Sequence, residues 1–286
     1  MLGFFLVGAL GLCLGSLLNV YIYRTVLNEK TGSKESVLFP KRSYCPKCKK
    51  TIKAFDNIPV LSYLWLKGKC RFCKDKISLK YISIEILTSS FFLFLYQHFY
   101  IGGRGFSDFF IALFLTYLLI AIFFIDIEVM IIPNLLSLGG LCVALVLSPC
   151  FPSWHNTLGE VTFLGEALEG FKSAIYGMIM GGGVIYIIGT LGSLAFKKEA
   201  MGGGDLKMMA MVGAFLGWKS IGFILFFSSF LGTIFSLLLI RLKSKKISDE
   251  IPFGPYLALG SFLMLCFRYD IYDLFSKWMS GELMFS

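Results

Sequence analysis

The chain has 286 residues, of which 56% are hydrophobic and 16% are charged, and its formal net charge is +9 at pH 7. Apolar runs recur along nearly the whole chain, and a membrane-spanning helix needs about 20 mostly apolar residues. This composition excludes an ordinary water-soluble domain and indicates an integral membrane protein. The positive charge is concentrated in residues 24–80, which hold 15 Lys and Arg against 4 Asp and Glu, a net +11.

The hydropathy predicts an all-α polytopic membrane protein of about eight transmembrane helices. The expected spans cover residues 2–23, 82–100, 109–127, 132–151, 171–196, 206–218, 220–240 and 252–267. The first span is too long and too poor in N-terminal charge for a cleaved signal peptide, and the sixth span is short. Three domains are expected: a first transmembrane helix (1–23), a polar segment with four cysteines (24–80) and a second transmembrane domain (81–286).

The charge pattern predicts the orientation of these spans. A basic segment between two membrane spans belongs on the cytoplasmic side, so residues 24–80 are expected inside and the N-terminus outside. The spans then alternate so that the acidic segment 152–170 lies outside and the basic segment 241–250 lies inside. Anionic membrane lipid is the expected partner of the positive charge. Nucleic acid is not, because no base-stacking module is visible.

Four of the eight cysteines fall in the basic segment, as the pairs Cys45-Pro-Lys-Cys48 and Cys70-Arg-Phe-Cys73 with 21 residues between them. Two such pairs at this spacing suit a tetrahedral zinc ion held by four thiolates. Two disulfides or a redox dithiol are the alternatives, and a reducing cytoplasm disfavours stable disulfides. A site with four sulfur ligands is closed, so the zinc is expected to stabilise the fold of this short segment. The stretch at 57–63 between the pairs has no assigned chemistry.

Two aspartates stand in hydrophobic surroundings, about eighty residues apart. Asp126 comes near the end of the span at 109–127, and Asp205 directly follows Gly202, Gly203 and Gly204. A carboxylate at the centre of a membrane helix costs roughly 2.5–3.5 kcal/mol on insertion scales, so it usually marks a function. Glycines weaken a helix but permit close backbone approach, and a substrate strand could lie against Gly202 and Gly204. In the expected topology both aspartates lie at cytoplasmic helix ends.

Two close carboxylates, one ionised and one protonated, can activate water and polarise a carbonyl, which is the chemistry of aspartyl peptidases. The spans alone are equally compatible with a proton- or cation-coupled transporter that uses Asp126 and Asp205. Each aspartate taken singly is also compatible with a structural role at a helix end. A third option is a zinc assembly module with a membrane anchor, although eight spans exceed what an anchor needs. His98 and His155 are expected near the outer face, which disfavours serine or cysteine mechanisms.

Small residues recur at helical spacing in two places. Gly177-x-x-x-Gly181 and Gly213-x-x-x-Gly217 bring four glycines to helix faces. Such spacing allows the backbones of membrane helices to approach closely. Tight helix crossings are therefore expected on either side of the Asp205 turn.

Taken together and in order, the motifs resemble the type IV prepilin leader peptidases, of the bacterial class that is also an N-methyltransferase. The resemblance covers most of the chain. It rests on GSLLNVYIYR at 15–24, the cysteine element at 45–73 with NIPVLSY at 57–63, IDIEVMIIP at 125–133, MGGGDLK at 201–207, GAFLGW at 213–218 and PFGPY at 252–256. Many relatives have Asp directly after the proline that matches Pro133, where this chain has Asn134.

The resemblance implies a function for each part of the chain. Asp126 and Asp205 match the family's two catalytic aspartates, which cleave a short basic leader after a glycine at the cytoplasmic face of the bacterial inner membrane. The new N-terminal residue, often Phe, is then methylated with S-adenosylmethionine. Substrates in the family are type IV prepilins and the pseudopilins of type II secretion, and self-association into a homo-oligomer is a further option. Methylation is assigned because the cysteine element is intact, and no G-x-G-x-x-G fingerprint marks a site for the methyl donor.

Overall fold

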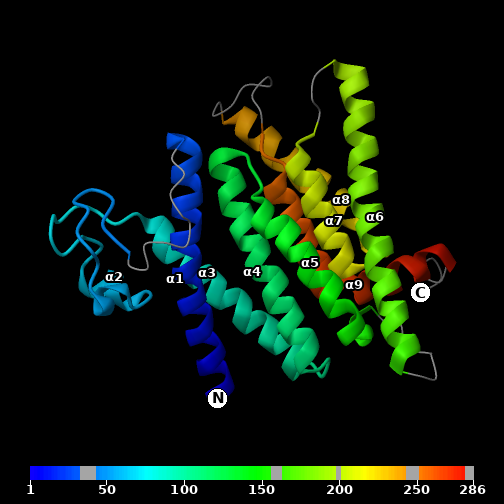
Figure 1. Cartoon of the computed structure of the whole chain (residues 1–286), viewed down its shortest axis with the longest axis horizontal. Helices are drawn as coiled ribbons and strands as arrows, with labels where there is room; N and C mark the ends of the chain where they lie inside the picture. Colours follow the sequence, from blue (N-terminus) through cyan, green and yellow to red (C-terminus); the bar gives the residue numbers. More distant parts are fainter. Residues whose placement is uncertain (33–42, 156–162, 198–200, 243–250, 281–286) are drawn as a thin grey trace. The chain divides into compact units, whose positions relative to one another are not determined.

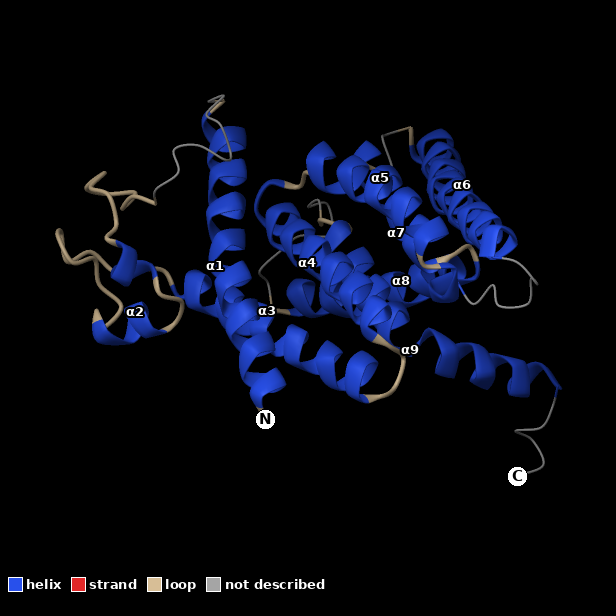
Figure 2. Ribbon diagram, turned by 60° about the horizontal axis from the view of Figure 1, so that its bottom comes forward, coloured by secondary structure: helices blue, strands red, loops and turns tan. Residues whose placement is uncertain are grey.

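Helices are the main regular elements of the residues that the computed structural model describes, which are 1–32, 43–155, 163–197, 201–242 and 251–280, and two isolated β-bridges lie in the cysteine segment (Figures 1 and 2). The helices are α1 (Leu2–Thr31), η1 (Ala54–Asn57), α2 (Leu61–Trp65), α3 (Leu79–Leu95), η2 (Tyr96–Ile101), α4 (Phe106–Val129), α5 (Asn134–Cys150), η3 (Pro152–His155), α6 (Phe163–Phe196), α7 (Gly203–Leu216), α8 (Lys219–Arg241) and α9 (Gly254–Ser280). The predicted all-α fold is confirmed for these ranges. Residues 243–250, which carry most of the basic segment expected inside, lie outside the described residues, as do residues 156–162 of the acidic segment.

Five of the described helices are long and apolar enough to cross a membrane. They are Leu2–Thr31, Leu79–Ile101, Phe106–Val129, Leu164–Ala195 and Lys219–Arg241. The other three predicted spans also form helices: α5 is a shorter apolar helix, α7 has only 14 residues, and α9 continues past its apolar part to Ser280. Length and composition of the helices thus give five candidate spans among the eight expected.

The chain divides into two compact units, Met1–Tyr117 and Leu118–Ser286. In the first unit, α1 packs closely on α3 at two glycines. A Cβ atom on Gly15 would lie 2.8 Å from the Cα atom of Glu85, and one on Gly11 would lie 2.6 Å from the Cα atom of Ser89. Because this contact joins the first membrane helix to α3, both helices fall in one unit with the cysteine segment. The domain boundaries predicted at residues 23 and 80 mark changes in hydropathy along the chain, whereas the two compact units reflect packing between helices.

In the second unit, the short helix α7 lies at the centre, with α5 and α6 beside it (Figure 1). All nine of its residues from Met208 to Leu216 are buried. Its contact with α6 is made by facing glycines: a Cβ atom on Gly177 would fall against the carbonyl group of Gly213, and one on Gly181 against that of Met209. The tight helix crossing predicted from the small-residue spacing is confirmed. Glycine lets the two backbones touch, which holds α7 and its first turn in a fixed place.

A buried arginine joins η3 to α9 in the same unit. Arg268 is 4% exposed, donates a hydrogen bond to the carbonyl oxygen of Trp154 at 2.6 Å, and stacks its guanidinium 4.3 Å from the centre of the Trp154 ring. Burial, with a smaller contribution from the Arg268 charge, lowers the pKa of His155 from 6.5 to about 4. His155 is therefore neutral at physiological pH.

Candidate functional site

The four cysteines of the basic segment form one cluster in the first unit. The sulfur atoms of Cys45, Cys48, Cys70 and Cys73 all lie within 4.8 Å of one another, and those of Cys45 and Cys73 are 3.8 Å apart. Four thiolates around a tetrahedral zinc ion, with Zn–S bonds of about 2.3 Å, would place their sulfurs about 3.8 Å apart. The predicted meeting of the two pairs is confirmed, and the cluster could hold a metal ion.

Each cysteine pair sits on a small hairpin of the same design. The first hairpin closes with hydrogen bonds from the N–H of Cys45 to Lys50 and from that of Lys49 to Cys45, at 3.0 and 2.9 Å. The second hairpin repeats this arrangement, with Cys70 bonded to Asp75 at 2.8 Å and Lys74 bonded to Cys70 at 3.0 Å. Both turns use a lysine with positive φ, 57° at Lys49 and 60° at Lys74. Two equivalent turns present their thiols to one point, as a closed metal site requires.

An ion pair braces the stretch between the two hairpins. Arg71 donates to both carboxylate oxygens of Asp56, with distances of 2.7 Å from Nε and 2.6 Å from the terminal nitrogen. The Asp56 side chain is only 4% exposed, and the hydrogen bonds from Arg71 keep its pKa below the usual value. This bidentate ion pair holds η1 against the second hairpin.

Asp126 lies in the last turn of α4 in the second unit and is 5% exposed. Its Oδ2 atom is buried and has no hydrogen-bond partner among the described residues. The backbone N–H of Gly254, the first residue of α9, faces the same carboxyl group. A Cβ atom on Gly254 would lie 2.7 Å from Oδ2, so only glycine leaves room there. Gly254 is part of the PFGPY motif, which carried no predicted role.

Asp205 lies in the first turn of α7, which begins directly after Gly202. Its N–H donates to the carbonyl oxygen of Gly202 at 3.1 Å. The three glycines before it have different surroundings. Gly202 and Gly203 are exposed, whereas a Cβ atom on Gly204 would lie 3.1 Å from the Cβ atom of Ile132. Gly204 therefore serves close packing, and the exposed backbone is that of Gly202 and Gly203.

This packing brings the two aspartates together. Ile132 belongs to the short connection between α4 and α5 that follows Asp126, so its contact with Gly204 joins the start of α7 to the end of α4. The carboxyl groups of Asp126 and Asp205 lie close enough for their charges to interact. Repulsion between two nearby negative charges makes it harder for both carboxyl groups to ionise.

A hydrogen bond supports the same junction from the other side. Lys207 of α7 donates to the side-chain carbonyl oxygen of Asn134, the first residue of α5, at 2.8 Å. Asn134 is the position at which the resemblance expects Asp. The amide oxygen of Asn134 accepts a hydrogen bond from the Lys207 ammonium group, as a carboxylate oxygen could, and this bond links α5 to α7.

The fold and the site together define a multi-pass helical membrane protein with a paired carboxylate site and a separate cluster of four thiols. Residues 9–99 match the description "Bacterial Peptidase A24 N-terminal domain", and residues 113–237 match "Type IV leader peptidase family". No solved structure matches the chain.

Three relatives named "Prepilin leader peptidase/N-methyltransferase" are similar to this protein over nearly the whole chain. The one from Aeromonas salmonicida is 35% identical over 98% of this chain and 95% of its own length. Those from Legionella pneumophila and Pseudomonas aeruginosa are 33% and 32% identical and cover 92% and 90% of this chain, and 90% and 87% of their own lengths. The chain belongs to the type IV prepilin leader peptidase/N-methyltransferase family. Membership in this family favours the predicted peptidase over the coupled transporter.

Proposed function

We propose that this chain is an intramembrane aspartyl endopeptidase that removes the basic leader of type IV prepilins or pseudopilins and then methylates the new N-terminus. The observation that carries the peptidase assignment is the packing of Gly204 on Ile132, which joins the start of α7, with Asp205, to the end of α4, with the buried Asp126. The names of the relatives supply the substrate and the second activity.

The proposed cleavage needs the two aspartates in different protonation states. One ionised carboxylate takes a proton from water, which attacks the carbonyl carbon of the scissile peptide, while the protonated partner donates a hydrogen bond to the carbonyl oxygen. The Gly254 N–H orients Asp126 for this task. The substrate backbone lies along Gly202 and Gly203, with Gly204 acting through its packing on Ile132.

The proposed topology has eight transmembrane helices, with α5, α7 and α9 joining the five long apolar helices. The cysteine segment 24–80 and both aspartates lie on the cytoplasmic side of the bacterial inner membrane, as the excess of Lys and Arg favours. The domain division at residues 23 and 80 describes this arrangement by membrane depth.

The metal of the thiol cluster is proposed to be zinc in a structural role. The described thiols fit four-coordinate zinc in number and spacing, and a four-thiolate site leaves no open position for a substrate. Cys45, Cys48, Cys70 and Cys73 would hold the ion and stabilise a segment that has little apolar core of its own. The methyl donor is S-adenosylmethionine.

Mass spectrometry of a prepilin co-expressed with the chain tests both activities at once. The wild-type chain is expected to yield a pilin that lacks its leader and carries one extra methyl group. Asp126→Asn and Asp205→Asn keep the size of each side chain but remove its acid–base function, so the pilin should stay uncleaved. Asp270→Asn, which alters an exposed carboxylate on α9, is the matched control and should process normally. Cleavage at the wild-type rate by either active-site variant would contradict the mechanism.

A further inference from the structure

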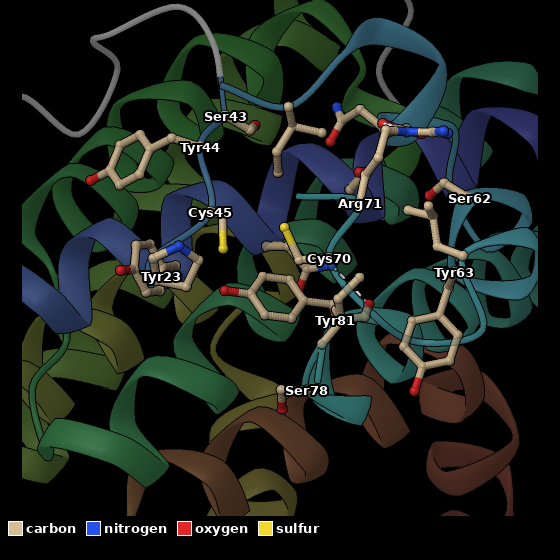
Figure 3. Close-up of a pocket in the computed structure, with 18 of the residues that line it drawn as sticks. Tyr23, Ser43, Tyr44, Cys45, Ser62, Tyr63, Cys70, Arg71, Ser78 and Tyr81 are labelled. Carbon is tan, nitrogen blue, oxygen red and sulfur yellow. Dashed lines mark hydrogen bonds and ion pairs between the residues drawn. The ribbon is translucent and has the colours of Figure 1, made fainter. Parts of the chain in front are cut away.

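The first unit contains a cavity of about 360 Å³ that borders α1, the start of α3 and both cysteine hairpins (Figure 3). Sites for small molecules enclose roughly 300–1,000 Å³, so this cavity has room for one such ligand. Its wall draws on three stretches, which contribute Asn19 and Tyr23 from 15–24, Ser62 and Tyr63 from 57–63, and Tyr81 and Glu85 from the start of α3. None of these three stretches has a role in the peptidase site.

The cavity wall contains a buried carboxylate without a positive partner. Glu85 is 9% exposed, and its Oε2 atom accepts a hydrogen bond from the N–H of Val60 at 2.8 Å. Within the described ranges no ion pair joins Glu85 to a Lys or Arg. Buried charges in proteins are normally paired. A cationic group on a ligand would supply the missing partner.

The contact between Glu85 and Val60 is held by an unusual backbone conformation. Val60 has φ 60° and ψ −51°, although a β-branched side chain disfavours positive φ strongly. Strained residues of this kind gather at functional sites, where the surrounding structure enforces them. Val60 directly follows Pro59 in the 57–63 stretch, and its strained turn aims the N–H at the carboxylate. The stretch without assigned chemistry thereby orients Glu85.

The wall also contains several aromatic side chains, among them Tyr23, Tyr44 and Tyr81, and the basic residues Arg24, Lys50, Arg71 and Lys76. Arg71 is already paired with Asp56, and a carboxylate group on a ligand would suit the other basic residues. Figure 3 displays the hydroxyl end of Tyr81 directed toward Tyr23 and Cys45. Asn19 donates to the Tyr81 carbonyl oxygen at 2.8 Å, which ties α1 to this side of the cavity. Aromatic faces attract cations and stack on flat heteroaromatic rings.

We propose that this cavity is the binding site for S-adenosylmethionine, with Glu85 as the counter-charge of the sulfonium group and the tyrosine wall as the surface for the adenine. The inference rests on the methyltransferase activity proposed above. The bound donor supplies a methyl carbon to the neutral α-amino nitrogen of the pilin, whose lone pair forms the new C–N bond. The electrons of the broken C–S bond stay on sulfur and the amine proton passes to water. Glu85 then faces a neutral thioether, which favours release of the product.

Binding measurements on the purified full-length chain test this assignment without relying on turnover. Calorimetric titration compares S-adenosylmethionine with S-adenosylhomocysteine, which has the same groups except for the methyl and the positive charge on sulfur. Glu85→Gln should weaken binding of the sulfonium ligand at least about tenfold, because a buried counter-charge is lost. Binding of the neutral ligand should change much less. Glu29→Gln, which alters an exposed carboxylate near the end of α1, should change neither.

A second variant covers the case in which Glu85→Gln does not fold, which loss of prepilin cleavage and of a thermal transition would reveal. Val20→Phe places a larger side chain on the cavity wall and should weaken both ligands. Wild-type affinity for S-adenosylmethionine in either folded variant would overturn the assignment while leaving the proposed methylation intact. A wild-type chain that cleaves prepilin but binds neither ligand would instead refute the methyltransferase half of the proposed function, and the cavity assignment with it.

Discussion

Replacing Gly177 by Ala tests how closely α6 and α7 must approach to hold Asp205 in place. The new Cβ atom would lie 2.6 Å from the carbonyl carbon of Gly213, whereas ordinary contact begins at 3.4 Å. The carbonyl oxygen of Gly213 lies closer still, so the helices must separate locally by more than about 0.8 Å, and overpacking of this kind typically costs about 1–3 kcal/mol. Because α7 carries Asp205 in its first turn, the same shift displaces one carboxylate of the pair. A misplacement near 1 Å can lower an enzymatic rate about 100-fold.

Thermal unfolding in detergent and the initial rate of prepilin cleavage measure these two effects. Gly177→Ala is expected to lower both the melting temperature and the cleavage rate. Gly183→Ala is the matched control on the same helix, because no atom lies within 4 Å of its Cβ position and alanine favours a helix by about 1 kcal/mol. That variant should be at least as stable as the wild type and fully active. A Gly177→Ala protein with wild-type stability and rate would refute the idea that glycine contact positions α7.

Three further changes have defined outcomes. Gly254→Ala would place a Cβ atom 2.7 Å from Oδ2 of Asp126 and should reduce prepilin cleavage at least about 100-fold, and a wild-type rate would remove Gly254 from the site. Cys48→Ser should lower the metal content of the purified chain, measured by plasma mass spectrometry, and the melting temperature with it; an unchanged metal content would refute the four-thiolate site. His155 has a pKa of about 4 in the folded chain against 6.5 when exposed, so the unfolded chain takes up a proton first as pH falls below 6.5. Stability should therefore decline between about pH 6.5 and 4, by up to about 3 kcal/mol, and His155→Gln should flatten this decline in thermal unfolding. Equal slopes for both proteins would contradict a buried neutral histidine.

Local patterns in the sequence were enough to predict the cysteine cluster and the positions of the helices. The spacing of Cys45, Cys48, Cys70 and Cys73 was enough to predict one cluster, because each pair of thiols shares a short turn. Apolar runs in the sequence marked the helices, but an apolar run does not show how far its helix continues into polar sequence. The first helix continues to Thr31, where Gly32 stops it with φ 65°, since a helix can continue into water after its lipid-facing part is complete.

Contacts between distant segments could not be read in advance. The packing of Gly204 on Ile132 and the approach of Gly254 to Asp126 depend on how helices cross, which no single stretch of sequence encodes. The same holds for Glu85, which looks like an ordinary acidic residue in α3 until Val60 is placed beside it. The glycines could be noted in the sequence, but the residues that pack against them could not be predicted from it.

The length of α7 has a consequence for the setting in which the enzyme works. Its 14 residues rise about 21 Å, less than the roughly 30 Å of a typical hydrocarbon layer. In the proposed eight-helix topology, such a helix ends inside that layer on at least one side and contacts α5, α6, α8 and α9 there. The depth of Asp205 below the surface therefore depends on bilayer thickness as well as on the protein. Lipids with shorter acyl chains would bring the exposed Gly202–Gly203 backbone nearer to water and to the arriving substrate, so membrane composition becomes a control on the reaction.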